Sequence, residues 1–175
     1  MDYETRATNR QEIRLYAKLF RVICGFKQFE PINPVQLLDK LSDIDLFEGV
    51  TYEVVQEDEM PKNVAARCIP MGNSYLIEIK ESVYIGAYEK GIGGYRMHIM
   101  HEIMHIFADI MGFKPIYERS LKDNTIPSYK SLEWVVKALT GEVMIPYEIS
   151  NGMTLEEIVE QFQVSKEAAA YRLKI

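Results

Sequence analysis

The sequence has few of the residues that form a cysteine-based metal site or a disulfide framework. Only two of its 175 residues are cysteines, Cys24 and Cys68, and they lack the close spacing of zinc ligands. We therefore exclude a zinc site made of cysteines and expect two buried free thiols, as in a reducing compartment.

Basic charge and long apolar runs are scarce as well. The 20 lysines and arginines stand against 26 acidic residues, and the net charge of -6 argues against non-specific binding to nucleic acid. No apolar run reaches transmembrane length, and residues 1–10 are polar and charged, unlike a signal peptide. With 47% hydrophobic and 26% charged residues, the chain is typical of a soluble globular protein, which we expect in the cytoplasm.

Histidine is rare too, and all three histidines fall within one stretch, Tyr95 to Met111. His101, Glu102 and His105 form the pattern H-E-x-x-H. On a helix, residues four apart lie on one face, so the two imidazoles can point at one ion. The carboxylate of Glu102 can then reach a water on that ion without being a ligand itself.

The residues around this motif are nearly all apolar, which predicts a buried helix. Two histidines and a glutamate in such a helix are costly to bury without partners, and a metal ion accounts for all three. A histidine pair satisfied within the core is the alternative. His98 lies one turn before His101, and we expect it to line the cleft or to support a ligand, because three ligands from one straight helix converge poorly.

A catalytic zinc site needs a third protein ligand, and the downstream candidates are Asp109, Glu118, Asp123, Glu133 and Glu142. Asp109 is expected instead to orient a ligand histidine. Glu118 and Asp123 stand in a polar stretch, where solvated charges are common. Glu142 is expected to reach solvent near a helix end. Glu133 is favoured because a carboxylate on an otherwise apolar helix needs a partner, but the other candidates stay open.

Caps, turns and periodicity predict the remaining elements. Glycines before the motif are expected to form a flexible entry to its helix, and residues 116–130 a long surface loop. The helices are predicted at 9–24, 34–41, 82–90, 132–143, 154–162 and 165–173, and the strands at 51–56, 63–69 and 74–79.

Two blocks of the sequence resemble the ImmA/IrrE family of metallo-endopeptidase-like proteins. The run from Tyr95 to His105 is similar to the family's R-F-T-L-A-H-E-L-G-H, and the run from Glu133 to Pro146 is similar to its E-x-x-A-N-x-F-A-x-x-L-L-M-P. The resemblance covers about half the chain, from Gly94 to the end, including a tail similar to the family's closing helical hairpin.

The resemblance implies an α+β fold: a mostly helical, zincin-like domain with a small antiparallel sheet packed on the H-E-x-x-H helix. The chain then forms a single metallopeptidase-like domain over 1–175, with a core at 1–150 and a C-terminal helical hairpin at 151–175. It also implies that Glu133 is the third metal ligand beside His101 and His105, holding one Zn²⁺ per chain, with Glu102 as the catalytic residue.

The function implied is that of a site-specific endopeptidase, an antirepressor that cleaves a helix-turn-helix repressor of a mobile element, prophage or stress response. Tyr117, Tyr129 and His98 are candidates for steadying the oxyanion, and the sequence does not choose among them. Two alternatives stand beside it. The protein keeps the metal and inactivates a repressor by binding alone, or it binds DNA through its last two helices, which have the outline of a helix-turn-helix.

Overall fold

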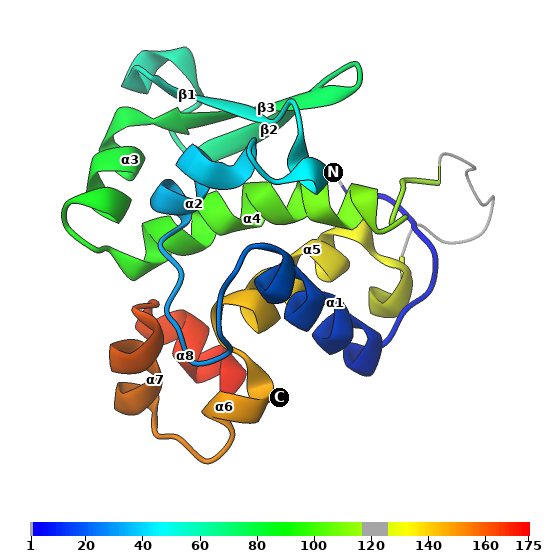
Figure 1. Ribbon diagram of the computed structural model, residues 1–175, viewed down its shortest axis with the longest axis vertical. Helices are drawn as coiled ribbons and strands as arrows, with labels where there is room; N and C mark the ends of the chain where they lie inside the picture. The colour runs from blue at the N-terminus through cyan, green and yellow to red at the C-terminus, as the bar shows by residue number, and fades with distance from the viewer. Residues whose placement is uncertain (1, 117–125) are drawn as a thin grey trace.

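The computed structural model describes residues 2–116 and 126–175, and within them it confirms an α+β fold. A long helix, α4 (Gly93–Ile110), runs through the middle of the molecule. The sheet lies on one side of α4 and helices α1 and α5 lie on the other (Figure 1). This layered arrangement buries eight of the 18 residues of α4 and leaves only His98 of them exposed, as the apolar sequence around the motif predicts.

Most elements begin and end within a residue or two of the positions predicted from caps and periodicity. Asn9 and Asn33 cap the first two helices, and Thr154 caps α7 with a reciprocal hydrogen bond to Glu157. One helix, α6, was not predicted because it spans a single turn. The helices besides α4 are α1 (Arg10–Ile23), α2 (Pro34–Leu41), α3 (Glu81–Tyr88), α5 (Leu132–Met144), α6 (Tyr147–Ser150), α7 (Leu155–Phe162) and α8 (Lys166–Arg172), with 3₁₀ turns at Asp45–Phe47, Glu57–Glu59 and Ser128–Lys130.

The sheet has three strands in the order β1-β3-β2, and it is mixed rather than purely antiparallel. As predicted, β2 (Ala66–Met71) and β3 (Ser74–Lys80) form an antiparallel hairpin, which turns at Gly72, where φ is +66°. Strand β1 (Thr51–Val55) instead pairs with β3 in parallel, Thr51 opposite Leu76. The prediction of an antiparallel sheet is therefore wrong for β1, because the chain crosses over before β2 begins.

One continuous hydrophobic core connects the sheet, α4 and the helices below it. At its centre the ring of Phe20 on α1 packs edge-on against Phe107 on α4, with 5.1 Å between ring centroids, and against Phe47 at 5.9 Å. Ile158 and Phe162 of α7 belong to the same buried cluster. The C-terminal hairpin thus shares its core with the rest of the chain. No described helix combines the length and the apolar character that a membrane crossing requires.

The entry to α4 is fixed by packing. Gly93 is the first residue of α4, and a Cβ added there would lie 2.3 Å from the backbone carbon of Val164 and 2.4 Å from the nitrogen of Ser165. The backbone between α7 and α8 therefore rests directly on Gly93, and the expectation of a flexible entry is wrong. Arg96 adds a second tie, donating from Nη1 to the side chain of Gln163 at 2.7 Å.

Candidate metal centre

Helix α4 brings the two histidines of the motif together. The imidazole rings of His101 and His105 meet edge to face, with 4.8 Å between their centroids. One potential ligand atom from each of His101, Glu102 and His105 lies within 4.8 Å of the others. These three residues therefore form a cluster that can hold a metal ion, on the single helix that the sequence predicts.

The first turn of α5 places Glu133 against both histidines. Its Oε1 lies 3.3 Å from Nε2 of His101, and its Oε2 lies 4.0 Å from Nε2 of His105. This turn is held by Ser131, which caps α5, and by Asp2, which accepts a hydrogen bond from the Glu133 backbone N–H at 2.9 Å. The carboxylate predicted as third ligand thus faces both predicted histidine ligands from another helix.

Burial sets the charge state of the two histidines. It lowers the pKa of His101 to about 4, a shift to which the neighbouring His105 adds. Burial also lowers the pKa of His105, while the negative charge of Glu133 opposes the shift. Both imidazoles are therefore neutral near pH 7, which is the form that donates a nitrogen lone pair to a metal.

Glu102 experiences the opposite effect. Burial raises the pKa of its carboxyl group to about 7, opposed by a hydrogen bond from the backbone N–H of Cys68 and assisted by the charge of Glu133. A carboxyl group with that pKa can both accept and release a proton near neutrality. The contact with Cys68 on strand β2 is not predicted by the sequence, because it depends on how the sheet lies across α4. Burial, with a contribution from Glu102, raises the pKa of the Cys68 thiol to about 12.

His98 is exposed beside the cluster. It lines an open cleft of about 330 Å³ together with Met97, His101, Glu133, Lys137 and Thr140. One turn along α5 from Glu133, the Nζ of Lys137 lies 3.7 Å from Oε1 of Glu133. The cleft gives a ligand direct access from solvent to His101 and Glu133.

The other residues singled out from the sequence lie apart from the cluster or outside the described residues. Asp109 accepts hydrogen bonds from the hydroxyl of Tyr75 and, at 2.8 Å, from Nζ of Lys114, so these groups take the place of the expected histidine partner. Tyr129 is half exposed in a 3₁₀ turn. Three further candidates, Tyr117, Glu118 and Asp123, lie outside the described residues.

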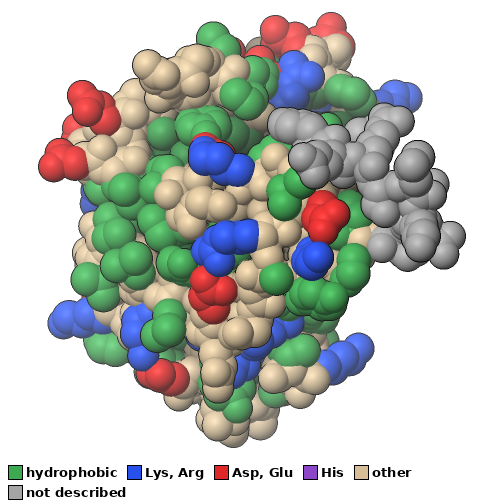
Figure 2. Space-filling view, turned by 90° about the vertical axis from the view of Figure 1, so that its right-hand side faces the viewer, with side chains coloured by type: hydrophobic (Ala, Val, Ile, Leu, Met, Phe, Trp, Pro, Cys, Tyr) green, Lys and Arg blue, Asp and Glu red, His purple; other side chains and the backbone are tan. Residues whose placement is uncertain are grey.

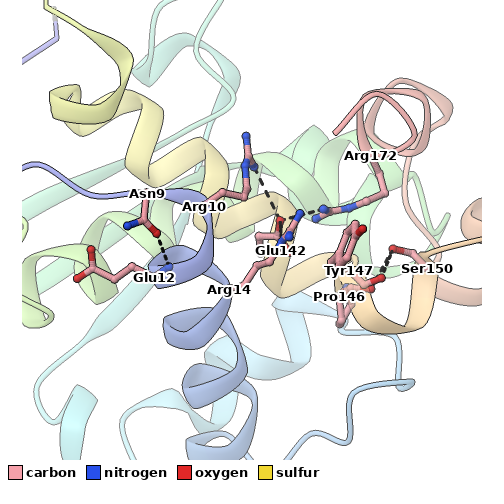
Figure 3. Close-up of polar contacts among 9 residues, drawn as sticks. All are labelled: Asn9, Arg10, Glu12, Arg14, Glu142, Pro146, Tyr147, Ser150 and Arg172. Atoms are coloured by element: carbon pink, nitrogen blue, oxygen red, sulfur yellow. Dashed lines mark hydrogen bonds and ion pairs between the residues drawn. The ribbon is translucent and has the colours of Figure 1, made fainter.

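Glu142 does not reach solvent, contrary to the sequence-based expectation. Only 2% of its side chain is exposed, and its Oε1 lies 2.8 Å from Arg172, 3.3 Å from Arg14 and 3.8 Å from Arg10. Figure 3 shows these three arginines converging on Glu142 from α1 and α8. The glutamate therefore ties three helices together and is unavailable to a metal.

Comparison with known proteins adds evidence on the fold alone. No family model matches the sequence, and neither does any curated protein. Among solved structures, a Mycobacterium tuberculosis transcriptional regulator is similar, with a TM-score of 0.55 and 12% sequence identity over 94% of this chain. The chain spans 46% of the length of that protein.

Proposed function

We propose that this protein is a zinc-dependent endopeptidase. The observation that carries the proposal is the position of the Glu133 carboxylate, which lies against Nε2 of both His101 and His105, while the partly buried Glu102 stands beside His101 on α4. Two neutral imidazoles and one carboxylate form a common set of protein ligands in catalytic zinc sites, which keep a further position open for water. The residues present therefore fit one Zn²⁺ per chain.

In this proposal the metal ligands, the general base and the oxyanion-stabilising group are different residues. His101, His105 and Glu133 would hold the ion, and a bound ion would supply polarisation of a carbonyl and a lowered pKa for a water. Glu102 takes the proton from the attacking water and passes it to the leaving amine, a role that its pKa of about 7 suits. His98, exposed in the cleft, is the described candidate for steadying the oxyanion.

Strand β2 offers a way to hold an extended substrate. It is an edge strand of the described sheet, it packs beside α4, and its Cys68 N–H contacts Glu102. A peptide paired with this edge, main chain to main chain, would run past the catalytic carboxylate. This arrangement favours an endopeptidase because it recognises backbone on both sides of the bond to be cut.

The target that we propose is a helix-turn-helix repressor, so that cleavage makes the protein an antirepressor. This part rests on the resemblance of the two sequence blocks to the ImmA/IrrE family. Direct DNA binding by the C-terminal hairpin is disfavoured because Arg172 is buried against Glu142 and cannot reach a phosphate. On the face shown in Figure 2, the described acidic and basic side chains are interspersed rather than gathered by sign.

The test compares the zinc-loaded protein with its Glu102→Gln variant, using a candidate repressor and casein as substrates. We expect one pair of fragments from the repressor, little cleavage of casein, and loss of cleavage when a chelator is added. Glu102→Gln should keep the zinc but cleave at least about a hundredfold more slowly. Repressor inactivated equally well by both proteins, without fragments, would instead establish action by binding alone.

A further inference from the structure

A second cavity opens beside the metal cleft. It measures about 390 Å³ and lies where α4, α5 and α8 meet. Met97 and Lys137 line both spaces, so the two adjoin each other. The apolar part of the lining is supplied by Met97, Trp134, Ala138, Ile145, Ala168 and Tyr171.

The chemistry of this cavity differs from that of the cleft. Its walls are largely apolar, and its volume lies in the range of pockets that enclose small ligands or large side chains. An apolar hollow open to water next to a metal cluster is typical of a binding site rather than of a packing defect. Met97 and Lys137 border both the cavity and the metal cleft, so a side chain held in the cavity lies beside the cleft that contains Glu133.

Charge at the cavity favours an anion. Lys137 lies on the boundary between the two spaces, and 69% of its side chain is exposed. The carboxylate of Glu133 lies near Lys137, but a bound metal would draw on the negative charge of that carboxylate and leave Lys137 less neutralised. Arg10, which also lines the cavity, stacks over the Trp134 ring at 5.3 Å. Among the described residues that line the cavity, Glu167 is the acidic one, and the basic ones therefore outnumber it.

We infer that this cavity is a specificity pocket for a peptide that carries a large apolar side chain next to an aspartate or glutamate. The inference rests on the proposed peptidase function and narrows its substrates to one class of sequence. The apolar side chain occupies the cavity against Trp134 and Met97. The neighbouring carboxylate of the peptide pairs with Lys137. This new ion pair takes the place of the Lys137–Glu133 contact, which is lost when Glu133 binds the metal.

The first experiment measures binding rather than cleavage. Trp134 is the single tryptophan of the chain, so its fluorescence reports occupancy of the cavity. The probes are four-residue peptides, blocked at both ends, with Phe-Asp, Ala-Asp or Phe-Lys at the centre. We expect Phe-Asp to bind zinc-loaded protein at least about tenfold more tightly than Ala-Asp, since the phenyl ring is buried. Equal affinity for all three peptides would overturn the inference.

The second experiment fills the cavity. A Cβ at Gly141 would meet no atom within 4 Å, so Gly141→Leu should be tolerated by α5 and place its side chain in the cavity. We expect this variant to keep its zinc and its circular dichroism but to lose Phe-Asp binding by about tenfold or more. Gly94→Leu is the matched control, because Gly94 is equally open, lies on α4 and does not line the cavity. Unchanged peptide binding in Gly141→Leu would refute the pocket.

The third experiment reverses the charge. Lys137→Glu should shift the preference from Phe-Asp toward Phe-Lys by several fold, and high salt should weaken the preference in both proteins. Binding of Phe-Asp by a protein that does not cleave would support the pocket while removing the peptidase proposal. A concentration-dependent dimer that Gly141→Leu abolishes would instead assign the cavity to a second copy of the chain.

Discussion

Glu133 and Glu142 are two glutamates on the same helix, nine residues apart, whose surroundings differ completely. Glu142 is almost fully buried and has three arginines within 4 Å. Glu133 is 36% exposed and faces two neutral imidazoles and one solvated lysine. Three arginines of the protein neutralise the charge of Glu142, whereas the charge of Glu133 is available to a bound cation.

The comparison separates a structural carboxylate from a candidate functional one. A buried anion enclosed by cations stabilises its contacts but has no capacity left for a ligand. A partly exposed carboxylate beside two neutral imidazoles keeps lone pairs free to bind a ligand. The two sites can therefore be distinguished by which property, folding or metal binding, each substitution removes.

The largest effect is expected from Glu142→Ala. Removing this carboxylate leaves Arg172 buried without a counter-charge, and the loss should be about 3–5 kcal/mol of unfolding free energy. Urea unfolding followed by circular dichroism, with a chelator present, measures it. The matched control is Glu148→Ala, which removes an exposed partner of Lys18 and should cost less than about 1 kcal/mol. Equal losses in the two variants would show that the arginine cluster does not stabilise the fold.

Glu133→Ala should weaken metal binding and leave the stability of the metal-free fold nearly unchanged. We expect zinc affinity to fall at least a hundredfold or so, because removing a ligand exceeds the effect of removing a group that only orients one. The metal-free stability should stay within about 1 kcal/mol of the parent, since the side chain is partly exposed. Competition with a chelator gives the affinity. The double variant His101→Ala, His105→Ala sets the baseline, and stoichiometric zinc in it would exclude the site.

The smallest effect is expected from Lys137→Met, which keeps the aliphatic stem and removes the ammonium 3.7 Å from Glu133. Zinc should bind a few-fold more tightly because a nearby positive charge no longer repels it, and the gain should fade as salt rises. The same chelator competition at low and high ionic strength measures this. Tighter binding that persisted unchanged in high salt would point to a packing effect instead.

The sequence predicts the local features of this molecule well. Helix bounds follow from capping residues such as Asn33 and Thr154, because a cap acts on its own first turn. The H-E-x-x-H pair follows from helical spacing within five residues. A charge on an otherwise apolar helix indicates Glu133, and the structure brings its carboxylate to both histidines.

What the sequence could not predict depends on distant segments. The arginines around Glu142 come from residues 10, 14 and 172, so nothing near Glu142 indicates its burial. The parallel pairing of β1 depends on a crossover, and the contact of Cys68 with Glu102 depends on where the sheet rests. The glycine-rich sequence around Gly93 is typical of a flexible segment. Only the approach of the Val164 backbone shows that Gly93 is a close packing contact.

The way α1 is held has a consequence for folding during synthesis. Its Arg21 donates from Nε to the carbonyl of Val143 at 2.7 Å, and its Arg14 pairs with Glu142. These partners lie more than 120 residues downstream, so α1 leaves the ribosome long before they exist. The side of α1 that packs against α5 must stay exposed in the nascent chain, or be covered by a chaperone, until α5 has been made. Translation pauses before residue 132 would lengthen that exposure, because α5 begins at Leu132.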